Sequence, residues 1–179
     1  MKILQSAQVK EVDKYTIENE PIHSINLMER AAGKISGWIS RKFSQGTEIN
    51  IFVGPGNNGG DGLAIGRQLA DKNYPVNLYL VKISDNLSPD AATNFERLKK
   101  QNKANIYTLE QKDQLPKVRP GAVILDGLFG SGLNRPIEGF PAELVKYLNR
   151  CDATRIAVDI PSGLFGEDNS DNNYEAVFK

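Results

Sequence analysis

Apolar and polar positions at the start of the chain repeat with the spacing of amphipathic helices. Val9, Val12 and Ile17 fall on one side of a helix that Ser6 can cap. A second and longer helical pattern begins at Ser24. Its apolar stripe consists of Leu27, Ala31, Ile35, Trp38, Ile39 and Phe43. The sequence therefore predicts two helices before any strand.

From residue 48 onward, short apolar runs alternate with helical patterns. The runs predict strands at residues 49–53, 76–81, 105–108, 122–126 and 155–160. The intervening patterns predict helices at residues 63–71, 89–101 and 141–150, with a weak helix or loop at 110–120. Strands that alternate with helices indicate βαβ units, and nearly continuous apolar runs indicate strands covered on both faces. The predicted fold class is α/β, with a mainly parallel central sheet preceded by two N-terminal helices.

The chain length of 179 residues suits one domain. We expect leading helices in residues 1–46 and an α/β core in residues 47–179. Residues 175–179 have the pattern of an entry to a further strand, and the sequence stops there. The pattern therefore predicts that the domain is truncated at its C-terminus.

Charge and composition exclude several functional classes. The 22 Lys and Arg residues balance the 22 Asp and Glu residues, so the basic surplus that nucleic-acid binding requires is absent. Cys151 is the single cysteine, which excludes an intramolecular disulfide and a zinc site of several cysteines. No apolar run approaches the roughly 20 residues of a membrane span. These features predict a cytoplasmic protein without nucleic-acid or membrane partners.

A glycine-rich stretch, residues 54–62, follows the first predicted strand and precedes a predicted helix. Gly54 to Gly59 fit the pattern G-x-G-x-x-G, and the N-terminus of a following helix favours an anion such as phosphate. Lys82 stands at the tip of the second strand, where an NAD-binding fold carries a ribose-binding carboxylate, so this fingerprint is incomplete. The alternative interpretation is a tight connection in which Asp61 caps the helix.

Two carboxylates end the fourth and fifth predicted strands. Asp126 begins a loop in which Gly130 to Gly132 can form an anion nest and Arg135 can contact phosphate. Asp159 begins the loop after the fifth strand. The two carboxylates could share a cation, or divide into an electrostatic anchor and a general base. An Asx-turn at Asp126 and a turn or N-cap role for Asp159 are the structural alternatives.

Three loops together resemble a known family. The strings GPGNNGGDG, DGLFGSGLNRP and VDIPSG, in this order, are similar to the YjeF N-terminal family, the NAD(P)H-hydrate epimerases. Residues 13–17 and 27–32 also resemble the two leading helices of that family. The resemblance implies a Rossmann-like three-layer α/β/α fold and epimerisation between the R and S forms of hydrated NADH and NADPH (NADHX and NADPHX). It implies a dehydratase as partner and a homodimer, and it leaves open whether the chain is the leading part of a fusion with that dehydratase.

The resemblance also implies roles for individual residues. Substrate-binding positions would be Asn57, Asn58, Gly59, Gly60, Asp61, Gly130, Ser131, Gly132, Leu133, Asn134, Arg135, Pro136 and Asp159. A potassium ion would be held by Asn58, Asp126 and Ser162. Asp159 would be the catalytic carboxylate that moves a proton at the hydrated carbon.

Two other functions compete with the epimerase interpretation. A nucleotide-binding or protein-interaction module without catalysis would fit loss of the loop carboxylates, but Asp61, Asp126 and Asp159 are all present. An NAD(P)-dependent oxidoreductase would require the carboxylate that is missing at the second strand.

Overall fold

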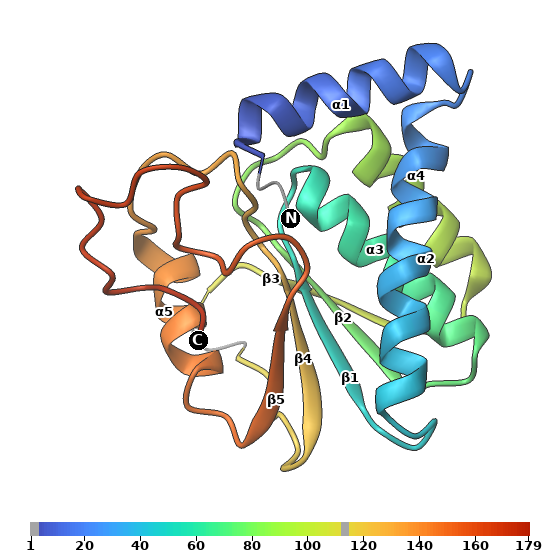
Figure 1. Cartoon of the computed structure of the whole chain (residues 1–179). Coiled ribbons are helices and arrows are strands. Elements are labelled where there is room, and N and C mark those ends of the chain that lie inside the picture. Colours follow the sequence, from blue (N-terminus) through green and yellow to red (C-terminus); the bar gives the residue numbers. More distant parts are fainter. Residues whose placement is uncertain (1–3, 112–114) are drawn as a thin grey trace.

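The computed structural model describes residues 4–111 and 115–179 and contains one five-stranded, all-parallel sheet (Figure 1). The strand order is β3-β2-β1-β4-β5. The strands are β1 (Ile49–Val53), β2 (Val76–Val81), β3 (Asn105–Leu109), β4 (Ala122–Gly127) and β5 (Ala153–Ala157). This order reverses direction at β1 and β4, as in Rossmann-like folds, so the predicted fold class is confirmed.

Helices cover both faces of the sheet, which gives three layers (Figure 1). The helices are α1 (Ser6–Asn19), α2 (Ser24–Lys42), α3 (Asn57–Asp71), α4 (Pro89–Gln101) and α5 (Gly139–Leu148). Helices α2, α3 and α4 lie on one side, α5 and the C-terminal segment lie on the other, and α1 crosses the top of the molecule. Within the described residues, no helix has the length and apolar character needed to cross a membrane.

Alternate side chains of the strands supply two separate cores. Ile51 and Val53 of β1 belong to the cluster beneath α2, α3 and α4. Phe52, between them, belongs to the cluster beneath α5, which also contains Phe178 from the end of the chain. The period of two along β1 thus explains why a fully buried apolar run can serve both faces.

Helix α2 packs with a different face from the one predicted. Its buried side chains are Met28, Ala32, Ser36 and Ile39, which lie against α3. Ala31 is exposed and Trp38 retains 41% of its accessible surface, so the predicted stripe is only partly used by the core. Small residues lie inward because α3 itself is rich in glycine and the two helices approach closely.

The predicted helix starts were wrong by one or two residues at several places. Gln5 and His23, instead of Ser6 and Ser24, occupy the N-cap positions of α1 and α2. Helix α5 begins at Gly139 instead of Pro141, and Gly139 has a φ of +63°. Ser88 is the N-cap of α4, and its side chain accepts a hydrogen bond from the Ala91 N–H, so the predicted start of this helix at residue 89 is confirmed.

Helix α3 begins six residues earlier than the sequence predicts. The prediction placed residues 54–62 in a loop, whereas Gly56 is the N-cap and Asn57 is the first helical residue. Low helix propensity favoured the loop, but tertiary packing overrides it here. A Cβ at Gly62 would lie 2.7 Å from the Cγ1 of Val53, so the absence of a side chain allows α3 to pack directly on β1.

The end of the chain also differs from the prediction. Strand β5 ends at Ala157 instead of residue 160, and the Val158 N–H then donates to the Asp126 carbonyl over 2.9 Å. Residues 175–179 contain no strand, and Phe178 is buried beneath α5. The predicted weak helix or loop at 110–120 lies partly outside the described residues, and residues 115–119 have no regular secondary structure.

Candidate active site

A cavity of about 810 Å³ lies at the carboxyl edge of β1, β4 and β5. The loops that follow these strands provide most of its walls, as expected for a parallel sheet whose crossovers diverge at this point. The first turns of α3 provide Asn57, Asn58 and Asp61. Helix α1 crosses the same edge and closes one side with Lys10 and Asp13 (Figure 1).

The backbone of Phe129 connects the three loops. Its carbonyl accepts hydrogen bonds from the Asn58 Nδ2 at 2.8 Å and from the Ser162 Oγ at 3.2 Å. Its N–H donates to the Ser162 Oγ over 2.9 Å. The backbone N–H and carbonyl of this one residue after β4 therefore connect α3 and the loop after β5.

Asp126 lies beneath this junction and is fully buried. Its carboxylate accepts hydrogen bonds from the Ser162 N–H at 2.7 Å, the Ser162 Oγ at 2.6 Å and the Leu128 N–H at 3.1 Å. Burial raises the pKa of Asp126 to about 6, while these hydrogen bonds oppose the rise. The Leu128 contact is the Asx-turn of the structural alternative, and the two bonds from Ser162 tie the loop after β5 to the end of β4.

Asp159 and Asp61 line the same cavity from opposite elements. The Asp159 Oδ2 accepts a hydrogen bond from the Ser131 N–H at 2.8 Å. Asp61 is partly buried on α3, and its pKa rises to about 7 because of burial first, and then because of the negative charges of Asp159, Asp13 and Asp90. The Asp61 carboxyl group therefore holds a proton more readily near neutral pH than an ordinary aspartate does.

The glycines of the first loop allow backbones to approach within van der Waals contact. A Cβ on Gly59 would overlap the carbonyl oxygen of Gly54, and one on Gly54 would overlap the carbonyl oxygen of Leu128. A Cβ on Gly130 would lie 2.7 Å from the Asp159 Oδ2. The glycines therefore bring the three loops together, in addition to any contact with a ligand.

Most of the predicted binding positions lie at this cavity. Its walls include Asn57, Asn58, Asp61, Gly130, Ser131, Gly132, Leu133, Asn134, Arg135 and Asp159. Gly59, Gly60 and Pro136 are not among the residues that line it. Gly59 and Gly60 are buried in α3 and serve its packing.

The alternative interpretation of Asp61 as the N-cap of α3 is wrong, because the helix starts at Asn57 and Asp61 lies within it. The predicted anion nest at Gly130 to Gly132 is partly occupied, because its central N–H, that of Ser131, already donates to Asp159.

The oxygen atoms around Asn58 have the character of a site for a hard cation. The Asn58 Oδ1 is buried and has no hydrogen-bond partner, although its Nδ2 is bonded. Ser162 Oγ and the Asp126 carboxylate belong to the hydrogen-bond network that includes this amide. Within the described residues, no group of three His, Cys, Asp or Glu side chains could hold a metal ion. The donors are oxygens with one carboxylate, so they suit a hard cation better than a transition metal.

The sequence analysis missed the contribution of α1 to the cavity. Ser6, Val9, Lys10 and Asp13 line it, and their spacing places them on one face of the helix. Ala31 and Ile35 of α2 line it as well. The helical periodicity of α1 was visible in the sequence, but its orientation over the sheet edge depends on tertiary structure.

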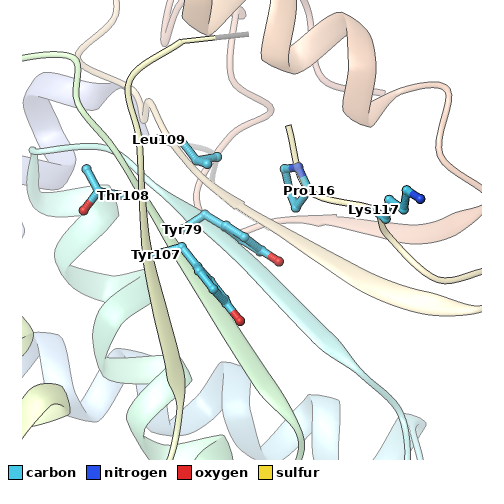
Figure 2. Close-up of a pocket in the computed structure, with 6 residues that line it drawn as sticks. All are labelled: Tyr79, Tyr107, Thr108, Leu109, Pro116 and Lys117. Carbon is cyan, nitrogen blue, oxygen red and sulfur yellow. The ribbon is translucent and has the colours of Figure 1, made fainter. Parts of the chain in front are cut away.

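A second cavity of about 380 Å³ lies on the sheet face near β3 (Figure 2). It is lined by Tyr79, Tyr107, Thr108, Leu109, Pro116 and Lys117, and Figure 2 shows the two tyrosine rings stacked side by side. Their centroids are 5.1 Å apart. Among its described lining residues, Lys117 is the single charged side chain, so the acid–base groups belong to the larger cavity.

Comparison with known proteins identifies similar sequences. The profile of the family described as "YjeF-related protein N-terminus" matches residues 24–178. An NAD(P)H-hydrate epimerase of Anaerococcus prevotii is 34% identical, and the match covers 93% of this chain and 77% of that protein. A bifunctional NAD(P)H-hydrate repair enzyme, Nnr, of Thermofilum pendens is 32% identical over 93% of this chain, which spans 32% of its length. The crystal structure of yeast ynu0, YNL200c, matches with a TM-score of 0.78 at 23% identity and covers 91% of this chain and 72% of that one, which supports the fold.

Proposed function

Because the chain belongs to the YjeF-related protein N-terminus family, we propose that it interconverts the R and S forms of hydrated NADH and NADPH. The observation that carries this proposal is the pair of carboxyl groups, Asp61 and Asp159, at one cavity beyond the carboxyl edge of a Rossmann-like sheet. Similar proteins named NAD(P)H-hydrate epimerase support the choice of substrate.

The cavity combines the features that this reaction needs. The substrate is a dinucleotide, and the N-terminus of α3 provides backbone N–H groups for its phosphates, while Arg135 of the loop at residues 130–136 provides a cationic side chain. Asp61 and Asp159 then lie at the part of the cavity where a neutral acid and an acceptor carboxylate can act on the hydrated ring.

Epimerisation requires one bond at the hydrated carbon to break and to form again. In one route, the hydroxyl leaves as water after receiving a proton, and the lone pair of the ring nitrogen stabilises the cation. Water then adds to the other face and gives up a proton. In the other route, the hydroxyl loses its proton and becomes a carbonyl as the carbon–nitrogen bond breaks, and the ring nitrogen keeps the electron pair of that bond and takes up a proton. Attack of this nitrogen on the other face of the carbonyl then closes the ring, with the nitrogen losing its proton and the oxygen regaining one. Asp159 moves the proton in either route, and no hydride is transferred.

The proposed function is tested by adding the purified protein to the pure R hydrate of NADH and following the S form by chromatography. We expect acceleration far above the spontaneous rate. Absence of acceleration by a folded protein that still binds dinucleotide would favour the binding-module alternative.

We also propose that potassium is the resident cation of the site at Asn58, Asp126 and Ser162. The unpartnered Asn58 Oδ1 and the oxygen donors around it support this choice. When bound, the ion supplies positive charge that offsets the carboxylates beside a pyrophosphate.

Potassium is expected to raise the melting temperature of the protein, because a ligand that binds only the folded state stabilises it. Saturating KCl should stabilise the wild type by about 1–3 kcal/mol relative to LiCl at equal ionic strength. Asn58→Ala should remove this difference, whereas Asn57→Ala, which changes the exposed neighbouring amide, should retain it. Equal melting temperatures of the wild type in the two salts would contradict the potassium assignment.

A second copy of the chain is the proposed partner of the open apolar face of α2. Trp38 is 41% exposed there, and Val9 and Val12 of α1 are 44% and 49% exposed. Trp38→Glu should lower the sedimentation coefficient at micromolar concentration to that of a monomer, while Tyr174→Glu, at another exposed aromatic, should not. A wild type that sediments as a monomer at high concentration would exclude the homodimer.

The reaction also implies an enzymatic partner and a compartment. An NAD(P)HX dehydratase would consume the S form, and the bifunctional relatives combine repair activities in one chain. We place the protein in the cytoplasm, where reduced nicotinamide nucleotides are abundant and where its free Cys151 remains reduced.

A further inference from the structure

Helix α1 contributes to the cavity wall and hardly at all to the core. None of its residues is buried, although Val9, Val12 and Ile17 form an apolar pattern. The Ser6 N–H donates to the Glu167 Oε1, which ties the start of α1 to the C-terminal segment. The match to the family profile begins at residue 24, after this helix. A role for α1 must therefore be sought at the cavity that it covers.

The face of α1 that meets the cavity carries charge. Ser6, Val9, Lys10 and Asp13 line it, and Asp13 is near enough to Asp61 for its charge to raise the pKa of that carboxyl group. Lys10, one turn before Asp13, lies on the same face of α1 and lines the same cavity as Asp61 and Asp159.

Cations are scarce in this cavity compared with carboxylates. Among its described lining residues, Asp13, Asp61 and Asp159 are acidic, and only Lys10 and Arg135 are basic. No ion pair or side-chain hydrogen bond joins Lys10 or Arg135 to another described residue. Both cations are therefore available to an anion in the cavity.

The loop at Gly130 to Gly132 has fewer free backbone N–H groups to bind an anion than its glycine-rich sequence suggests. The Ser131 N–H is bonded to Asp159, so it is not available to a phosphate. A substrate with a pyrophosphate brings two further negative charges beside three carboxyl groups, and side-chain cations must offset part of that charge.

We propose that Lys10 of α1 binds a phosphate group of the dinucleotide substrate, an inference that rests on the proposed function. The phosphate can belong to the pyrophosphate, which both hydrates carry, or to the ribose phosphate that only the NADPH hydrate carries. In either case, α1 completes the substrate site, and Lys10 acts on binding and leaves the chemical step to the carboxyl groups.

The test compares Lys10→Ala with Lys14→Ala, which removes an exposed lysine of the same helix that does not line the cavity and pairs with Glu18 at 3.9 Å. We expect Lys10→Ala to raise KM about tenfold with kcat within about twofold, as loss of one charge-assisted contact does. Lys10→Arg should restore most of the affinity, and Lys14→Ala should behave as the wild type.

Use of both hydrates distinguishes the two phosphate sources. An equal rise in KM for the NADH and NADPH hydrates assigns Lys10 to the pyrophosphate, and a rise for the NADPH hydrate alone assigns it to the ribose phosphate. Unchanged KM for both hydrates, or a loss confined to kcat, would overturn the proposal.

Calorimetric binding of unhydrated NADPH separates this proposal from the proposed function, since it needs no turnover. If the wild type binds NADPH but does not epimerise the hydrates, the proposed function fails. Weaker NADPH binding by Lys10→Ala than by Lys14→Ala would then still support the phosphate contact, and equal binding would overturn it.

Discussion

Asp159→Asn is expected to lower the rate of R-to-S interconversion by about 10²- to 10⁴-fold, the range typical for loss of a general acid–base group. The amide oxygen of Asn can still accept the hydrogen bond that the Asp159 Oδ2 receives from the Ser131 N–H, so the loop keeps its anchor. The change therefore removes proton transfer with little effect on geometry. The rate is measured by chromatographic separation of the two hydrates.

A second readout of the same variant checks the electrostatics of the site. The negative charge of Asp159 is the largest cause, after burial, of the raised pKa of Asp61. Removing that charge should lower the pKa of Asp61 from about 7, as observed by carboxyl-carbon NMR. Asp152→Asn, at an exposed carboxylate just before β5, is the matched control and should change neither quantity. Undiminished epimerisation by Asp159→Asn would remove Asp159 from the proton-transfer role.

Gly59→Ala is expected to destabilise the protein by about 3 kcal/mol, measured by urea unfolding. Helix propensity alone predicts the opposite sign, because alanine in a helix interior is about 1 kcal/mol more favourable than glycine. The added methyl group would overlap the carbonyl oxygen of Gly54, a backbone atom that cannot move without shifting the first loop. A decrease in the free energy of unfolding would therefore support a start of α3 within residues 54–62, and an increase would contradict it.

Gly56→Ala is the matched control for that substitution. Gly56 is the N-cap of α3 with a φ of −83°, and a Cβ built there meets nothing within 4 Å. We expect the free energy of unfolding of the Gly56→Ala variant to stay within about 1 kcal/mol of that of the wild type. A Gly59→Ala variant as stable as Gly56→Ala would contradict the close packing at the start of α3.

The order of elements could be predicted from the sequence because β1, β2 and β4 are short apolar runs with both faces buried. A strand that is buried on both faces is apolar along its whole length, so it can be recognised without knowing which elements pack against it. Strand β5 was predicted too late, because its limits depend on pairing with β4 and its residues are only partly buried.

The start of α3 could not be predicted, because it depends on contacts between distant segments. Residues 57–62 have low helix propensity, and their glycines fit a helix only when β1 and the loop after β4 lie against them. The residues next to α3 in the sequence do not indicate which distant segments will pack against it. The same reason explains the wrong assignment of Asp61 as an N-cap.

The candidate site could be predicted where strand ends determine it. Asp126 lies near the end of β4 and Asp159 follows β5, and because these strands are parallel neighbours in the sheet, both residues reach the same edge. Ser162 and Asn58 meet at the Phe129 carbonyl, a backbone group that has no sequence signature. The contribution of Lys10 was also missed, because nothing in the sequence fixes the angle at which α1 crosses the sheet.

The central claim is that this cavity epimerises hydrated nicotinamide nucleotides, and the most direct measurement starts from the pure S hydrate of NADH. With catalytic amounts of wild-type protein in potassium buffer, we predict rapid conversion to the same R/S mixture that is reached from the pure R hydrate. The mixture should be approached far more slowly with Asp159→Asn. A wild type that is folded and binds dinucleotide, yet leaves both pure forms to equilibrate at the spontaneous rate, would contradict the claim.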